Sequence, residues 1–410
     1  MTRRAPVPPA VLSFGSADFE EPNWVNAQHL MWRLALRHRV LYVNSLGLRA
    51  PRASRADLRK VLRRLAAVGR GATRPDPERF LHVLSPFSLP PALSGARARL
   101  GPALLAGQLR AVLRRLGLER PVTWVFLPSA APVLERLDVG PVVYHCVDAY
   151  EANPGVDPEL VRALEDRLLS RAAVVLASSE PLRARLAQRH PRVRRMENVA
   201  DIAAYPPPDM PPPEPPDLAV IGRPRVIYAG NLASYKCDLA MLEDAARSRP
   251  DIQWVFVGAA GRGEAGLDRS RLADRANVHR LGEKPPGELA AYIHHCDVGL
   301  IPFRDTPLTR HSFPMKFFEY LACGRAVVSA PLPSLAAHLR EPLVFSYRTP
   351  KEFVDAIERA READTPALRR ERRRLAEEHN WERRLAEVEE LLADLAPGAG
   401  LTHPGPSTCR

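Results

Sequence analysis

The chain has 410 residues, 46% of them hydrophobic, and carries 59 Lys and Arg against 47 Asp and Glu, a formal net charge of +12. This length favours two domains, and the apolar content is ample for full cores. No stretch reaches about 18 uninterrupted apolar residues, which excludes a membrane-spanning helix. The positive charge permits contact with nucleic acid, an anionic membrane surface or phosphorylated substrates, without choosing among them.

The five cysteines are scattered, with no C-x-x-C pair and no Cys/His metal spacing. An odd, unclustered set is typical of reduced thiols rather than of a disulfide framework. The N-terminus, MTRRAPVPPAVLSFG, has basic residues but lacks the apolar core of about 7 to 15 residues that a signal peptide needs. We therefore expect a cytoplasmic protein, and the charge leaves room for peripheral attachment to the inner face of the plasma membrane.

The first half of the chain alternates short apolar runs with helical patterns. It opens with strands over Val11–Gly15 and Arg39–Ser45 on either side of a helix from about Trp24 to Arg37. Further strands are predicted over 80–86, 122–128, 142–148 and 173–179, and further helices over 92–116 and 158–171. This alternation predicts a parallel sheet with helices on both faces.

The segment 51–71 has a different pattern, in which apolar residues recur at helical spacing and Arg and Lys fill the remaining faces. A basic amphipathic helix of this kind is typical of proteins that lie on anionic lipid headgroups. The alternative is a solvated helix whose apolar stripe packs on its own domain.

A Pro-rich stretch at 201–224 lacks helical periodicity and predicts a semi-rigid, extended linker. It separates an N-terminal domain, 1–200, from a C-terminal domain, 225–366. The second domain repeats the α/β pattern, with strands over 225–230, 252–258, 278–282, 297–303, 326–330 and 343–347, and helices over 238–247, 288–295 and from about 315 and 351. Terminal helices are expected over 367–395, followed by a disordered tail, 396–410.

Glycine and charged residues gather where strands of the second domain end. Gly230 and Gly258 each end a strand, and Lys236 comes just before a helix. Lys316 and Glu319 lie three apart at the start of another helix, so they share a face. Helix N-termini bind phosphate, a lysine adds a positive charge, and a carboxylate suits the vicinal hydroxyls of a ribose. We predict a nucleotide-diphosphate-sugar pocket here, facing the other domain; a surface ion pair is the alternative for Lys316 and Glu319.

Three runs in this half, YAGNLASYKCDLAMLEDA, NVHRLGEKPPGELAAYIHHCDVGLIPF and PMKFFEYLACGRAVVSAPLP, resemble the donor-binding half of a retaining GT-B glycosyltransferase of the group 1 kind. The N-terminal runs FGSADFEEPNWVNAQHLMWRLALRHRVLYVNSLGLR and VVYHCVDAYEANPG extend the likeness to a bacterial subgroup similar to teichuronic acid synthesis proteins. The resemblance implies an α/β GT-B fold, two Rossmann-like domains facing across a cleft. It also implies transfer with retention that needs neither metal nor cofactor, because the nucleotide sugar is a substrate.

The resemblance assigns roles to several donor-side residues. The family's ribose-binding glutamate falls on Glu319, whereas the first acid of its E-x7-E motif falls on His311. Its phosphate-binding Arg/Lys pair falls on Asn231 and Lys236, so only the lysine is retained. Lys316 would then supply part of the missing positive charge. Arg304 and Thr309 are further candidates for contacts with the donor sugar.

In the first domain, His145 and Asp148 end a strand on the predicted cleft edge and are the candidate catalytic residues. His145 would contact the donor sugar or the acceptor, and Asp148 would orient an acceptor hydroxyl. The alternatives are a core histidine and a turn cap. On the acceptor side, Gly15 corresponds loosely to the family's glycine-rich loop, and Asp18 and Asn23 lie in the loop that follows, which is equally typical of a solvated acidic face.

The predicted function is transfer of a sugar from a nucleotide-sugar donor to a lipid-linked or polysaccharide acceptor in cell-surface polysaccharide synthesis. His311 and Asn231 keep open a catalytically weak or non-enzymatic sugar-nucleotide-binding protein, and an epimerase of the same architecture is a further alternative. A nucleic-acid-binding protein rests only on the charge. Aromatic residues make up just 6% of the chain and no recognition motif is present, so we expect no nucleic-acid partner.

Overall fold

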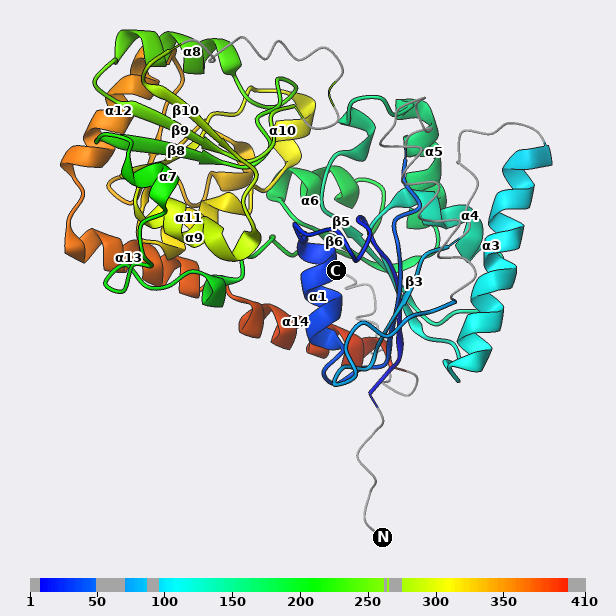
Figure 1. Ribbon diagram of the computed structural model, residues 1–410. Coiled ribbons are helices and arrows are strands. Elements are labelled where there is room, and N and C mark those ends of the chain that lie inside the picture. Colours follow the sequence, from blue (N-terminus) through cyan, green and yellow to red (C-terminus); the bar gives the residue numbers. More distant parts are fainter. Residues whose placement is uncertain (1–7, 49–70, 87–95, 262–263, 265–274, 397–410) are drawn as a thin grey trace, which may run out of the picture.

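The computed structural model describes residues 8–48, 71–86, 96–261, 264 and 275–396. Within them, two parallel sheets lie side by side, each covered by helices (Figure 1). The first sheet has seven strands in the order β3-β2-β1-β4-β5-β6-β7, and the second has six in the order β10-β9-β8-β11-β12-β13. In both, the strand order reverses in the middle of the sheet, where doubly wound folds bind ligands at the carboxyl ends of their strands.

The first sheet is made of short apolar runs, and all the strands and helices predicted for the described part of this half are present, most of them shorter than predicted. The strands are β1 Val11–Phe14, β2 Val40–Val43, β3 Leu81–Leu84, β4 Val122–Val125, β5 Val142–Cys146, β6 Ala172–Ala177 and β7 Val193–Arg195. The helices are α1 Asn26–Leu34, α3 Ala96–Arg115, α4 Ala131–Leu134, α5 Pro158–Leu169 and α6 Glu180–Ala187. The sequence did not predict α6 or β7, because α6 buries only Leu182 and Leu186 and β7 is a short, largely exposed edge strand.

The second half follows the same plan. Its strands are β8 Arg225–Ala229, β9 Gln253–Val257, β10 Val278–Gly282, β11 Val298–Ile301, β12 Ala326–Ser329 and β13 Val344–Ser346. Its helices are α7 Pro216–Ala219, α8 Leu239–Ser248, α9 Leu289–His294, α10 Pro307–His311, α11 Lys316–Ala322 and α12 Pro350–Glu362, and α13 Pro366–Glu377 and α14 Trp381–Leu395 end the described chain. The short helix α10 was not predicted.

The Pro-rich stretch 201–224, which the sequence predicted to be a semi-rigid, extended linker, packs against the second domain. Tyr205 and Leu218 are buried in the core of the second domain. Asp217 pairs with Lys284 at 2.6 Å and accepts a hydrogen bond from the Tyr292 hydroxyl at 2.8 Å. Proline removes backbone donors, so side-chain packing rather than a backbone ladder holds this stretch against the domain.

Helix α14 returns to the first domain. Trp381, Val388 and Leu392 are buried in the same core cluster as residues of β1, β2 and α1. His38 bonds through Nε2 to a Glu389 carboxylate oxygen at 2.7 Å. The chain therefore passes between the domains twice, once between β7 and β8 and once between α13 and α14 (Figure 1).

Two predictions fall largely outside the described residues, namely the basic amphipathic helix at 51–71 and the tail at 396–410. Among the residues that are described, no helix combines the length and the apolar character that crossing a membrane requires.

Arg372 is expected to be a major contributor to the stability of the second domain. Its side chain is fully buried on α13, and Nη1 lies 2.6 Å from an Asp364 carboxylate oxygen. Its guanidinium also donates to the carbonyls of Gly324 and Pro342. Arg372→Met should lower the free energy of unfolding by about 3 kcal/mol, because Asp364 loses its buried partner and the carbonyls lose their donors. Urea unfolding measures this, with the exposed Arg370→Met as control; equal effects of the two would contradict the assignment.

Candidate active site

A cavity of about 820 Å³ lies between the two domains. Its walls are the segments that follow strand ends in both sheets. The first domain contributes, among others, Ser16, Asn23, Ser45, Asp148, Tyr150, Asn153 and Asn198, and the second contributes Gly230, Tyr235, Lys236, Phe303, Thr309, Ser312, Met315, Lys316 and Glu319. This is the carboxyl edge at which doubly wound folds bind ligands, and the volume suits a ligand the size of a nucleotide sugar.

Lys316 opens α11 and borders the cavity. Its Nζ lies 3.8 Å from the centroid of the Tyr228 ring and 5.5 Å from that of Phe303. It makes no ion pair within 4 Å among the residues that the structure describes. Burial, followed by the nearby charge of Lys236, lowers the pKa of Lys316 to about 7. The aromatic faces stabilise the ammonium form, but an anion in the cavity would be a stronger partner.

Glu319 lies on the same side of α11 as Lys316 and also lines the cavity. Burial raises the pKa of Glu319, while the charge of Lys316 and a hydrogen bond with Tyr205 act in the opposite direction. The pair is therefore not a solvated surface ion pair. Because α11 has only seven residues, we attribute the positive character of this wall to the lysines rather than to a helix dipole.

Lys236 provides the second ammonium group of this wall, with its Nζ 5.6 Å from the Phe303 centroid. Asn231, which the resemblance placed at the phosphate, is not among the residues that line the cavity. Its side chain hydrogen-bonds to Tyr235, and its carbonyl accepts from the Tyr228 hydroxyl at 3.0 Å. The structure therefore leaves Lys236 and Lys316 as the cations of this wall.

Gly230 lines both the main cavity and a second cavity of about 380 Å³. Gly258, Arg280 and Glu283 line this second cavity. A Cβ added to Gly258 would lie 2.3 Å from the Gly230 carbonyl oxygen, and both glycines have positive φ, 136° and 135°. The two strand ends can approach this closely only because neither residue has a side chain.

Asp148 reaches the cavity from the first domain, where the Ser312 hydroxyl of the second domain donates to its Oδ1 at 2.6 Å. Two more hydrogen bonds cross here, from the Ser179 hydroxyl to the His311 carbonyl at 2.7 Å and from the Asn198 amide to the Phe313 carbonyl at 3.1 Å. Burial raises the pKa of Asp148, against the effects of Ser312 and Lys236. The segment before α11 is thus held against the first domain.

His145 does not line the cavity, contrary to its prediction as a catalytic residue. Its side chain is 4% exposed in the core, with ring centroids 6.0 Å from Trp124 and 5.1 Å from Phe126. Burial lowers the pKa of His145 to about 3. Helices cover both faces of this sheet, so a histidine within β5 is enclosed whichever face it points to.

Four other predicted residues also lie outside the lining, namely His311, Gly15, Asp18 and Arg304. Arg304 donates from Nη1 to the Ser234 carbonyl at 3.3 Å. His311 ends α10 and donates from Nδ1 to the Pro307 carbonyl at 2.7 Å. Gly15 is buried beneath Tyr42, where an added Cβ would lie 2.0 Å from the phenolic oxygen. Asp18 does not line the cavity, although Ala17 and Asn23 on either side of it in the chain do. Within the described part of the chain, no group of three or more His, Cys, Asp and Glu residues could hold a metal ion.

Comparisons with known proteins agree with this geometry. Residues 239–390 match the family described as glycosyl transferase-like. A Bacillus subtilis (strain 168) protein named as a teichuronic acid biosynthesis glycosyltransferase, TuaH, is 26% identical over 283 residues, which cover 64% of this chain and 69% of TuaH.

Solved structures show the same fold. Sucrose-phosphate synthase from Thermosynechococcus elongatus superposes with a TM-score of 0.70 at 15% identity, covering 94% of this chain and 99% of the synthase. HepE from Anabaena, in complex with UDP and glucose, gives 0.66 at 17% identity, covering 94% of this chain and all of HepE (100%). The chain is a glycosyltransferase of the GT-B type. Its fold confirms the predicted pair of Rossmann-like domains facing each other across a cleft.

Sequence reasoning missed several residues that line the transferase's cavity. Ser312 lies between His311 and Phe313 and makes the hydrogen bond to Asp148. Tyr235 precedes Lys236, and Phe303 supplies the ring near both lysines. Their adjacency to predicted site residues was the available signal. Thr309, a predicted sugar contact, lines the cavity but is 1% exposed, and its hydroxyl is bonded to Thr306 and Arg304.

Proposed function

We propose that the transferase moves a sugar from a nucleoside diphosphate sugar to a lipid-linked or glycan acceptor in cell-surface polysaccharide synthesis. The observation that carries the proposal is the convergence of Lys236, Lys316 and Glu319 on one wall of the cavity between the domains. Two ammonium groups and one carboxylate are the side chains that a diphosphate and a ribose need.

The donor would lie along the second domain. Its diphosphate contacts Lys236 and Lys316, and its ribose hydroxyls donate to Glu319. Its base enters the adjoining cavity past Gly230, between Gly258 and Arg280. HepE, which shares the fold, has been solved with UDP-glucose, and this supports a donor of the same class.

The chemistry would be electrostatic on the donor side. As the sugar–phosphate bond breaks, negative charge develops on the departing diphosphate, and the two ammonium groups on this wall of the cavity stabilise it. Asp148 would orient an acceptor hydroxyl by accepting its hydrogen bond, and its raised pKa makes it a better base than an exposed aspartate. We propose retention of the anomeric configuration and independence from metal ions on the ground of the group 1 resemblance.

The acceptor would enter from the first domain, past Ser16 and Asn23. The name of TuaH, which assigns that protein to teichuronic acid biosynthesis, supports a glycan or lipid-linked glycan acceptor. Attachment to the inner face of the plasma membrane through 51–71 is part of the same proposal, since such acceptors are built at that surface.

Transfer assays with a panel of radiolabelled UDP-, GDP- and dTDP-sugars, together with a thermal-shift screen of the same nucleotides, test the function. We expect turnover with at least one donor and a raised melting temperature with its nucleotide. Binding without turnover would favour a sugar-nucleotide-binding protein, and interconversion of the donor alone would favour an epimerase. Neither binding nor turnover with any donor would refute the proposal.

The affinity for a nucleotide sugar, whose diphosphate keeps the same charge between pH 6 and 8.5, is expected to fall as pH rises through about 7, the pKa of Lys316. Below this pH Lys316 is charged, and above it the diphosphate loses one cationic partner. We expect about tenfold weaker binding at pH 8.5 than at pH 6, which corresponds to a difference of about one pKa unit for Lys316 between the free and the bound protein. Calorimetry with the nucleotide sugar that supports turnover measures it, and Lys316→Met should bind weakly with little dependence on pH. An unchanged pH profile in this variant would contradict the assignment.

The same lowered pKa has a consequence for stability. Between about 7 and the ordinary lysine value of 10.5, Lys316 binds a proton in the unfolded chain but not in the folded one. The stability contributed by this group therefore rises with pH over that window. Lys316→Met should remove this dependence without destabilising the fold at neutral pH, so weaker nucleotide binding in the variant can be assigned to the site.

A further inference from the structure

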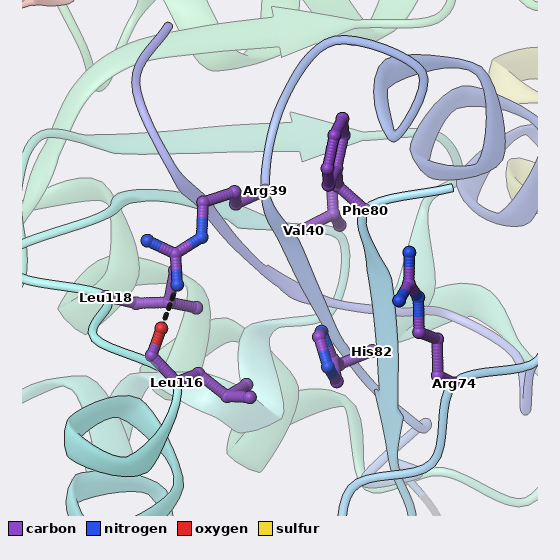
Figure 2. A pocket seen from close by; sticks show the side chains of 7 residues that line it. All are labelled: Arg39, Val40, Arg74, Phe80, His82, Leu116 and Leu118. Atoms are coloured by element: carbon purple, nitrogen blue, oxygen red, sulfur yellow. Dashed lines mark hydrogen bonds between the residues drawn. The ribbon is translucent and has the colours of Figure 1, made fainter. Parts of the chain in front are cut away.

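A third pocket, of about 140 Å³, lies on the first domain at the end of the sheet opposite the donor cavity (Figure 2). Its lining residues come from the start of β2, the start of β3, the segment before β3 and the turn after α3; they are Arg39, Val40, Arg74, Phe80, His82, Leu116 and Leu118. Arg39 and Phe80 precede their strands, whereas the donor cavity follows strand ends. The two sites therefore lie at opposite ends of the strands of this sheet.

Two guanidinium groups border this pocket without being neutralised. Arg39 donates from Nη1 to the Gly117 carbonyl at 3.2 Å and from Nη2 to that of Leu116. Arg74 donates from Nε to the Arg79 carbonyl at 3.1 Å and from Nη2 to that of Pro77. Hydrogen bonds to backbone carbonyls fix the position of a guanidinium group but do not neutralise its charge. Among the described residues, neither arginine has a carboxylate within ion-pair distance, and no acidic residue lines the pocket.

His82 lies between the two arginines, with Phe80 above it (Figure 2). Its imidazole is half-buried and forms no hydrogen bond within the described part of the chain. Burial, and then the charges of Arg74 and Arg39, lower the pKa of His82. The positive charges of the two arginines therefore disfavour protonation of the imidazole, and no acidic residue of the pocket offsets them. An anion bound between the two arginines would instead raise the pKa of His82.

We propose that this pocket binds the phosphate group of a phosphate monoester or diester. Guanidinium groups on two sides offer their remaining N–H donors to phosphate oxygens, and His82 adds a third donor once the anion favours its charged form. Val40, Leu118 and the 52%-exposed Phe80 supply an apolar wall for the carbon side of the ester. The small volume excludes a whole nucleotide, which distinguishes this ligand from the donor.

The phosphate can come from a soluble ester or from a lipid headgroup, and the composition of helix α3, which leads to the pocket, makes it necessary to test the lipid source as well. Helix α3 forms the outer side of this domain (Figure 1) and ends next to the pocket. It exposes Leu100 and Leu104, 54% and 55% exposed, and carries Arg110 and Arg114 without any Asp or Glu over its length. Exposed leucines and arginines without acids suit an anionic lipid surface.

Calorimetry of the full chain with glycerol 3-phosphate, in the presence of saturating nucleotide to fill the donor cavity, tests the soluble arm. Arg39→Gln/Arg74→Gln should bind the ester about 10- to 100-fold more weakly, the loss expected for hydrogen bonds to a charged group. The matched control is Arg162→Gln/Arg171→Gln, which removes the same charge from exposed positions elsewhere on the domain. Phe80→Glu places a negative charge at the rim without removing either arginine, and should weaken binding likewise if the double variant does not fold.

Co-sedimentation with vesicles of phosphatidylcholine, with and without phosphatidylglycerol, tests the lipid arm with the same variants. A lipid source predicts binding to the anionic vesicles that the pocket variants lose and the control keeps. A soluble source predicts ester binding that the pocket variants lose, with vesicle binding unchanged. The proposal is overturned if neither ligand distinguishes the pocket variants from the control. Nucleotide binding in the same samples reports on the donor site separately, so failure here leaves the proposed function intact.

Discussion

Glu319→Ala is expected to weaken binding of the nucleotide-sugar donor by about 10- to 100-fold. In the proposed complex the carboxylate accepts hydrogen bonds from the ribose hydroxyls, and bonds to a charged group contribute about 1.5 to 3 kcal/mol. An alanine offers the hydroxyls no acceptor in place of the carboxylate. Calorimetry with the donor that supports turnover gives the affinity, and initial rates should show the loss in kcat/KM.

Glu319→Gln separates the charge from the shape of the side chain. The amide keeps the volume and one acceptor, so donor affinity should fall less than in the alanine variant. Burial raises the pKa of Glu319, so the folded state holds a proton to higher pH than the unfolded state, and stability falls as pH rises above the ordinary value. The glutamine variant should therefore be at least as stable as the parent at neutral pH. Donor affinity within twofold of the parent in Glu319→Ala, as in the exposed control Glu362→Ala, would refute the ribose role.

Asp148→Asn is expected to lower turnover by about 100-fold or more while leaving donor affinity nearly unchanged. The carboxylate reaches the cavity from the domain opposite the proposed donor wall, and on this ground we propose that it acts on the acceptor. An asparagine keeps the shape but is no longer a base, and a positioned base contributes about 10²- to 10⁴-fold. Steady-state rates at saturating donor, with calorimetry of donor binding, separate the two effects.

Ser312→Ala is the control for this interpretation. It removes the hydrogen bond between the domains at 2.6 Å but keeps the carboxylate of Asp148. If Asp148 acts on the acceptor, Ser312→Ala should lose much less turnover than Asp148→Asn. Equal losses would show instead that Asp148 serves to hold the domains together. The raised pKa of Asp148 further predicts that turnover falls on acidification at a higher pH than an exposed aspartate would give.

The structure shows where the two residues that depart from the family pattern lie. His311 and Asn231 replace residues that the resemblance placed at the donor, but neither lines the cavity. His311 bonds to the Pro307 carbonyl, and Asn231 bonds to Tyr235. Neither side chain fills the vacated role. Lys316 and Lys236 are instead the cations nearest to the proposed diphosphate, and the low pKa of Lys316 reflects its burial and the nearby charge of Lys236.

The sequence by itself determined the local elements and supplied the candidate residues for the proposed donor wall. Apolar runs of four to six residues between helical patterns specify buried parallel strands, and most of them appear within a few residues of their predicted bounds. Lys316 and Glu319 share a face because residues three apart on a helix must do so. Gly230 and Gly258 followed from the backbone approach that only glycine permits.

Only the tertiary structure decided which of the remaining polar residues face the cavity. The sequence places His145 and Asp148 three residues apart in the same run, yet one lies in the core and the other at the cavity, because the strand ends between them. The bond from Ser312 to Asp148 and the pocket of Arg39, Arg74 and His82 join segments far apart in the chain. Such contacts, and the pKa values that burial sets, depend on how whole layers pack, which no local pattern in the sequence records.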